Sequence, residues 1–153
     1  MVRVLALVCF AFIAAPLQAQ EKAVCDLLTD PEVGDLLGQS AVQKRTIVGA
    51  ANDCVWFVKG FSLTVSRVVD EPATAQMMVD TALKNVRQGD KAKEEPGIGQ
   101  RAASTVSWTG RGLSMVVATG GTAWTLVLDK LDQKIDVEKA LPKLRALAKK
   151  LAG

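Results

Sequence analysis

The chain has 153 residues, enough for one domain with a substantial core, and carries 19 Lys and Arg against 16 Asp and Glu. The formal net charge of +3 is too balanced for a nucleic-acid-binding protein, which needs a clustered basic surface. The chain contains no His and no Tyr. Ser–His–Asp and Cys–His catalytic arrangements and His-containing zinc sites are therefore excluded.

Residues 1–19 have the pattern of a secretory signal peptide. Arg3 gives a short positive region, an apolar run follows from Val4 to Leu17, and Ala19 offers a small-residue cleavage position. The run is shorter than the roughly 20 apolar residues of a membrane-spanning helix. We therefore expect residues 20–153 to form a single periplasmic or secreted domain, without a stable membrane anchor after signal cleavage.

Two cysteines, Cys25 and Cys54, follow the apolar segment. Paired cysteines of an exported protein usually form a disulfide in an oxidising compartment, so we predict a Cys25–Cys54 bridge. Trp56 lies two residues after Cys54 and shares its strand face, so we expect it to pack near the bridge.

The best-marked element is a short helix over residues 30–37. Thr29 and Glu32 have the spacing of a capping box, Pro31 fits the first turn, and Gly38 is placed to end the helix. These features explain the local acidic residues as helix capping and a solvated face, rather than as a cation site.

Hydrophobic periodicity predicts the remaining elements. They are a strand over 41–48, a hairpin of 54–58 and 61–69, a helix over 73–87, a polar loop over 88–100, strands over 101–108, 112–118 and 122–128, and a helix over 137–151. The order is α-β-β-β-α-β-β-β-α. Consecutive antiparallel strands with helices on one face predict an α+β two-layer sandwich.

Candidate cofactor motifs are weak. The stretch "GIGQR" (97–101) lacks the third glycine or the Gly-Lys-Ser/Thr ending of a phosphate loop and precedes a strand, so we predict a turn with positive φ. Asp129, Asp132 and Asp136 lack calcium-loop spacing, and Asp136 is placed to cap the last helix. We expect no metal, no cofactor and no catalytic residue.

The three tryptophans, Trp56, Trp108 and Trp124, all fall on predicted strands. Large aromatic side chains usually fill a core, and this is our first interpretation. Aromatic residues also dominate ligand grooves and partner surfaces, so all three remain candidate contacts for a ligand or partner.

The pattern "CDLLTDPEVGDLLG" followed by "CVW" resembles small bacterial exported domains of unknown function, many of them lipoproteins. The later "GIGQRA" is similar to the Gly-x-Gly-Asp-x-Ala turn of that group, with Gln100 in place of the acid. The resemblance implies an α+β sandwich, a Cys25–Cys54 disulfide and no catalytic residue. This chain lacks the lipoprotein cleavage motif.

We expect an exported, non-catalytic binding or accessory protein, whose partner is a protein or a small apolar ligand held between sheet and helices. One alternative is a carboxylate-dependent cell-envelope hydrolase, which requires two carboxyl groups facing each other across a cleft. Another is a structural or envelope-stress protein that acts through an exposed sheet face.

Overall fold

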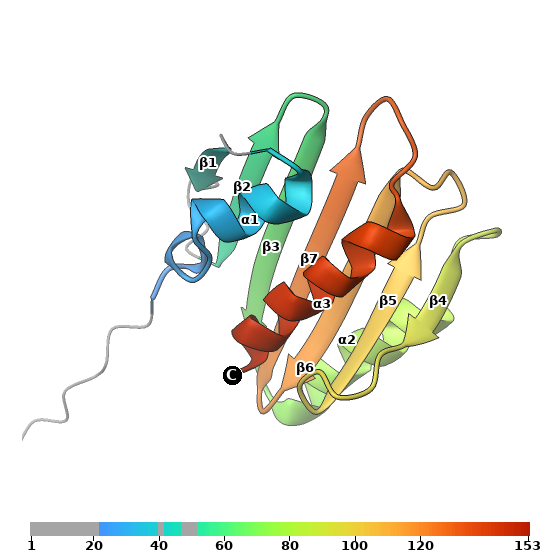
Figure 1. Cartoon of the computed structure of the whole chain (residues 1–153). Helices are drawn as coiled ribbons and strands as arrows, with labels where there is room; N and C mark the ends of the chain where they lie inside the picture. Colours follow the sequence, from blue (N-terminus) through green and yellow to red (C-terminus); the bar gives the residue numbers. More distant parts are fainter. Residues whose placement is uncertain (1–21, 40–41, 47–51) are drawn as a thin grey trace, which may run out of the picture.

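The computed structural model describes residues 22–39, 42–46 and 52–153, and the predicted signal peptide lies outside these ranges. Within them, seven strands form one antiparallel sheet in the order β1-β2-β3-β7-β6-β5-β4 (Figure 1). The elements in chain order are η1 (Val24–Asp26), α1 (Asp30–Leu37), β1 (Gln43–Thr46), β2 (Asp53–Val58), β3 (Phe61–Val69), α2 (Pro72–Lys84), β4 (Lys91–Glu94), β5 (Arg101–Val106), β6 (Gly112–Thr119), β7 (Thr122–Lys130) and α3 (Val137–Ala152).

The predicted α+β sandwich and its element order are confirmed, with one strand added. Strand β4 lies inside the segment 88–100 that the sequence predicts to be a loop, and it pairs with β5 from Lys91↔Val106 to Glu94↔Ala103. It is an edge strand with mostly exposed, charged side chains. Such a strand lacks the apolar alternation that marks a half-buried strand, because neither of its faces is deeply covered.

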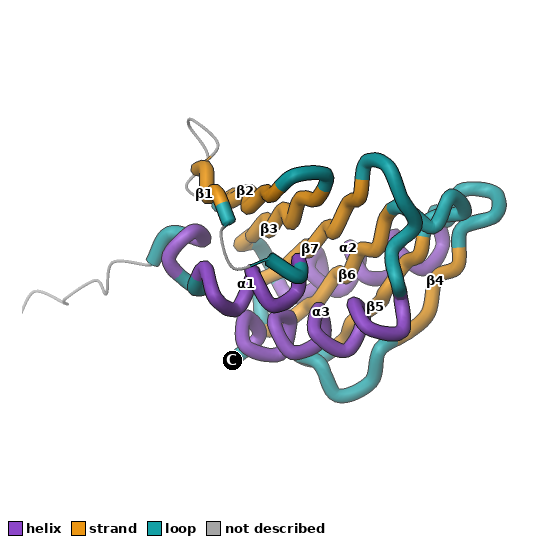
Figure 2. Tube along the Cα trace, turned by 45° about the horizontal axis from the view of Figure 1, so that its top comes forward, coloured by secondary structure: helices purple, strands orange, loops and turns teal. Residues whose placement is uncertain are grey.

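The helices lie on both faces of the sheet (Figure 2). One core, under α1 and α3, contains Leu113 and Met115 of β6, whereas Ala75 and Val79 of α2 form a second core with Val116 from the opposite side of β6. The prediction that all helices cover one face is wrong, because α2 covers the face opposite to α1 and α3. Residues 115–118 of β6 are all buried. This continuous apolar run reflects helices on both faces, because a strand covered on both faces has no solvent-facing polar positions.

The opening segment is attached to the sheet as predicted. A disulfide joins Cys25 of η1 to Cys54 of β2, and both residues are buried together with Trp56. The Glu32 carboxylate accepts hydrogen bonds from the backbone N–H and the hydroxyl of Thr29, each at 2.8 Å. Helix α1 then ends at Gly38, whose φ of 70° is left-handed.

None of the helices in the described ranges has both the length and the apolar character needed to cross a bilayer.

Candidate ligand-binding site

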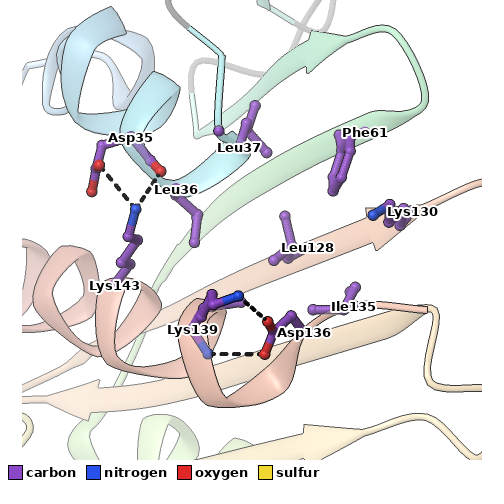
Figure 3. Close-up of a pocket in the computed structure, with 12 residues that line it drawn as sticks. Asp35, Leu36, Leu37, Phe61, Leu128, Lys130, Ile135, Asp136, Lys139 and Lys143 are labelled. Carbon is purple, nitrogen blue, oxygen red and sulfur yellow. Dashed lines mark hydrogen bonds and ion pairs between the residues drawn. The ribbon is translucent and has the colours of Figure 1, made fainter. Parts of the chain in front are cut away.

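A pocket of about 210 Å³ opens between the C-terminal end of α1 and the first turns of α3, above the adjoining ends of β3 and β7 (Figure 3). Phe61 begins β3 and Lys130 ends β7, and the antiparallel register places these two residues opposite each other. The pocket therefore draws its lining from four elements and from the loop between β7 and α3.

The floor of the pocket is apolar. It is formed by Leu36, Leu37, Phe61, Leu128, Ile135 and Ala140. All of these except the half-buried Phe61 are buried. The backbone N–H of Ile135 donates to the carbonyl of Gly110 at 2.7 Å, which fixes the loop before α3 at one side of the floor.

The rim of the pocket is charged. Lys143 of α3 donates to the backbone carbonyl and to Oδ1 of Asp35 on α1, at 2.8 and 2.9 Å (Figure 3). Lys139 forms an ion pair with Asp136 at 2.8 Å. The Lys130 ammonium lies 4.3 Å from the centre of the Phe61 ring, a cation–π distance. Three lysines and two aspartates thus surround an apolar floor.

The contact between Asp136 and Lys139 at the rim favours the charged form of both side chains. The hydrogen bond from Lys139 lowers the pKa of Asp136, and the same bond raises the pKa of Lys139. Both groups are therefore charged at neutral pH. Asp136 also caps α3 as predicted, because its Oδ1 accepts from the Lys139 backbone N–H at 3.3 Å.

The tryptophans lie in three different settings, and none of them is among the described residues that line this pocket. Trp56 is fully buried, and Trp124 is buried beneath the Arg67 guanidinium, 5.8 Å from the ring centre. Trp108 is 69% exposed. Its prediction as a strand residue is wrong, because β5 ends at Val106 and Trp108 lies in the turn that leads to β6.

Trp124 borders a broader, more polar hollow of about 560 Å³ between η1 and the end of α3. Arg67 fills part of it and is held by Asn52, whose Oδ1 accepts at 2.9 Å, and by the backbone carbonyl of Lys22. This hollow borders Lys22, the first residue that the structure describes. This hollow has fewer buried apolar residues in its lining than the pocket between α1 and α3, which is therefore the stronger candidate for an apolar ligand.

One buried polar cluster has no evident signal in the sequence. Glu95 is 3% exposed, and its carboxylate accepts from the Ser104 hydroxyl at 2.7 Å and from Arg145 Nε at 2.8 Å. This cluster ties α3 to the loop after β4. Within the described part of the chain, no group of three or more His, Cys, Asp or Glu is arranged to hold a metal ion.

The pocket residues had no common signal in the sequence. Leu36 and Leu37 lie in the predicted opening helix, but Asp35 and Lys143 are 108 residues apart and meet only through the fold. The architecture defines an antiparallel α+β sandwich with an amphipathic pocket on the face that carries α1 and α3. Comparisons of the chain with protein-family models, with curated proteins and with solved structures gave no match.

Proposed function

We propose that the protein is an exported, non-catalytic binding protein that holds a small amphiphile in the pocket between α1 and α3. The observation that carries this proposal is the combination of an apolar floor around Leu128 and Ile135 with a lysine-rich rim. The Cys25–Cys54 disulfide supports an oxidising compartment, where such bridges persist. Export and membership in the exported group that the opening motif resembles are parts of the same proposal.

The pocket volume limits the size of the ligand. Sites for drug-sized molecules usually measure about 300–1,000 Å³, and this pocket measures about 210 Å³. A short acyl chain or a single large apolar side chain fits this space.

The rim favours an anionic end on the ligand. An ammonium carries three N–H donors, and stacking over the Phe61 ring leaves donors of Lys130 for an incoming carboxylate. Lys139 and Lys143 add positive charge on the opposite side and are held in place by Asp136 and Asp35. A short-chain fatty acid combines the apolar body and the carboxylate that these features accommodate.

Carboxylate-dependent hydrolysis is the alternative, since Asp35 and Asp136 both line the pocket. That chemistry needs one carboxyl group that still holds a proton near neutral pH. Lys139 instead lowers the pKa of Asp136, and Asp35 is paired with Lys143. These pairings favour binding over hydrolysis as the role of the pocket.

Titration calorimetry with octanoate, octanol and octylamine tests the proposal. Octanoate should bind with a saturable signal, octanol more weakly and octylamine least. Ala140→Leu fills the pocket and should weaken octanoate binding by about tenfold or more, which corresponds to about 1.4 kcal/mol. Ala146→Leu, on the exposed side of the same helix, should bind like the wild type.

A second variant tests the same site without changing the core, in case Ala140→Leu destabilises the protein. Lys130→Gln is a rim change that should reduce the preference for octanoate over octanol without altering the melting temperature. The proposal fails if none of the three compounds binds, or if Ala140→Leu binds octanoate as tightly as Ala146→Leu does.

A further inference from the structure

The two most exposed large apolar side chains of the described chain are Trp108, at 69%, and Leu131, at 71%. Both lie in loops, Trp108 between β5 and β6 and Leu131 between β7 and α3. Figure 1 places these two loops and the turn between β2 and β3 along the same end of the sheet. We call this surface, formed by residues 59–60, 88–90, 107–111 and 131–135, the loop end.

Hydrogen bonds that involve both backbone and side-chain groups hold the loop end together. Arg111 Nη1 donates to the Leu131 carbonyl at 3.3 Å, and the Leu131 N–H donates to the Gly60 carbonyl at 3.0 Å. On the other side, the Trp108 N–H donates to Asp90 Oδ1 at 2.7 Å. Trp108 and Leu131 are thus carried by a connected set of turns rather than by independent tips.

The loop end is basic. Residues within it or beside it include six basic side chains, Lys59, Arg87, Lys91, Arg111, Lys130 and Lys134, against four acidic ones, Asp90, Asp129, Asp132 and Asp136. The loop end therefore has a local excess of two positive charges. Asp90 is further engaged by the Trp108 backbone. The two exposed apolar side chains are therefore surrounded by more basic than acidic groups.

A small pocket lies within the same surface. It measures about 220 Å³ and is lined by Lys59, Gly60, Phe61, Lys130, Asp132 and Gln133. Two ammonium groups and an amide at this hollow suit a phosphate-sized anion, because lysine binds phosphate as a point charge, while the Asp132 carboxylate in the same lining opposes part of this attraction. The hollow adjoins Leu131 in the chain, so an anionic head group and an apolar contact come together here.

We propose that the loop end docks reversibly on an anionic lipid bilayer, with Trp108 and Leu131 at the level of the head groups and the basic side chains against lipid phosphates. Tryptophan is enriched at membrane–water interfaces, where its ring and N–H suit the mixed environment. Basic side chains add attraction to anionic lipids. The loop end fits a protein partner less well than a bilayer, because stable protein interfaces need a broad, packed apolar core.

The docking surface also adjoins the ligand pocket. Phe61 and Lys130 line both the pocket between α1 and α3 and the hollow of the loop end. Docking would hold the ligand pocket beside the bilayer. The docking proposal does not depend on the ligand proposal, because Trp108 and Leu131 do not line the pocket between α1 and α3 in the described structure.

Vesicle sedimentation and tryptophan fluorescence test the docking. The full chain should bind vesicles of phosphatidylcholine with phosphatidylglycerol at low salt, bind pure phosphatidylcholine vesicles far less, and dissociate as salt is raised. Because Trp56 and Trp124 are already buried, a blue shift in emission on binding reports on Trp108. Inorganic phosphate at equal ionic strength should not displace the protein more than chloride does.

Paired variants separate docking from general effects. Trp108→Ala with Leu131→Ser, and separately Arg111→Gln with Lys134→Gln, should each weaken vesicle binding by about tenfold or more. Met77→Ser changes an apolar side chain of α2 that is 59% exposed, and Lys149→Gln removes a charge from the exposed side of α3. Both controls should bind like the wild type.

Three outcomes would overturn the proposal. The first is no binding to the anionic vesicles at low salt, and the second is wild-type binding by both double variants. The third is full displacement by inorganic phosphate, which would make the loop end a site for the free anion. Sedimentation velocity without lipid measures whether the protein associates with itself through the same surface. Self-association that the same double variants abolish, with no vesicle binding, would assign the surface to a second copy of the chain.

Discussion

Lys150, near the end of α3, donates to both carboxylate oxygens of Glu32, in the first turn of α1, at 2.6 and 2.8 Å. The two residues are 118 positions apart in the chain. Together with the hydrogen bonds from Thr29, this contact lowers the pKa of Glu32 from 4.5 to about 2, with Lys150 as the largest cause. The same carboxylate thus begins the first helix and holds it against the last.

The Glu32 contact predicts a defined loss of stability in acid. A carboxyl group whose pKa is lower in the folded than in the unfolded protein stabilises the fold above its unfolded pKa, and this contribution disappears as pH falls through its folded pKa. The window therefore extends from about pH 4.5 down to about pH 2. Because the Glu32 side chain is 34% exposed, solvent screening reduces its contribution to about 1 kcal/mol.

Urea unfolding at neutral pH and at points across that window measures this effect. Lys150→Gln should lower the free energy of unfolding near pH 7 by up to about 1 kcal/mol and should flatten its dependence on pH in acid. Lys149→Gln, a change at the neighbouring exposed lysine, should leave both unchanged. An unaltered acid profile in Lys150→Gln would contradict the assignment.

Removal of the disulfide should cost a large part of the stability. Cys25 and Cys54 are 29 positions apart, and the chain-entropy model assigns about 3.5 kcal/mol to closing a loop of this length. Cys25→Ala with Cys54→Ala should therefore lower the free energy of unfolding by about that amount in urea. Wild-type protein unfolded in the presence of a thiol reductant provides the matched comparison. Equal denaturation midpoints with and without reductant would show that the bridge does not stabilise the fold.

Because the Glu95 carboxylate is buried, we expect removal of Arg145 alone to destabilise the protein more than removal of both charges. Arg145→Met leaves this carboxylate with the Ser104 hydrogen bond. Removing one partner of a fully buried ion pair costs about 3–5 kcal/mol. Because the Arg145 side chain is 34% exposed, we expect a loss at or below the lower end of that range. Glu95→Leu combined with Arg145→Met removes both charges and should lose less than Arg145→Met by itself. Denaturant unfolding of the two variants checks the order. A double variant less stable than the single one would rule out a desolvated charge as the cause.

The glycine turn before β5 offers a comparison between two similar positions. Gly97 and Gly99 both have positive φ, 74° and 56°. A Cβ at Gly99 would lie 2.7 Å from the Ala118 carbonyl oxygen, whereas no described atom lies within 4 Å of one at Gly97. Gly97→Ala should cost about 1 kcal/mol for the backbone conformation alone.

Gly99→Ala should cost at least about 1 kcal/mol more than Gly97→Ala, because it adds overpacking to the backbone cost. The clash falls on the Ala118 carbonyl, which accepts the Gln100 N–H at 2.8 Å, so the hydrogen bond that joins the residue before β5 to β6 would be disturbed as well. Thermal unfolding of the two variants measures the difference. Equal melting temperatures would indicate that β6 can shift away at no cost.

The local elements could be predicted because their causes are local. The Thr29 and Glu32 capping box, the alternation along Phe61–Val69 and the stripe of the last helix each reflect the neighbours of a residue within a few positions. Strand β4 could not be predicted, because an exposed edge strand is specified by its partner β5 rather than by its own pattern. Trp108 was assigned to a strand because β5 and the turn after it have no sharp compositional boundary.

The sequence by itself determined the α+β class, the cysteine pair, the capped opening helix and the exclusion of histidine-based chemistry. These follow from composition and short-range spacing. Only the tertiary structure decided which face α2 covers, how Lys143 meets Asp35 above an apolar floor, and that Trp108 and Leu131 share one basic end. The reason is physical: each of these relationships joins side chains from distant segments, and their proximity depends on sheet order and on the packing of both cores.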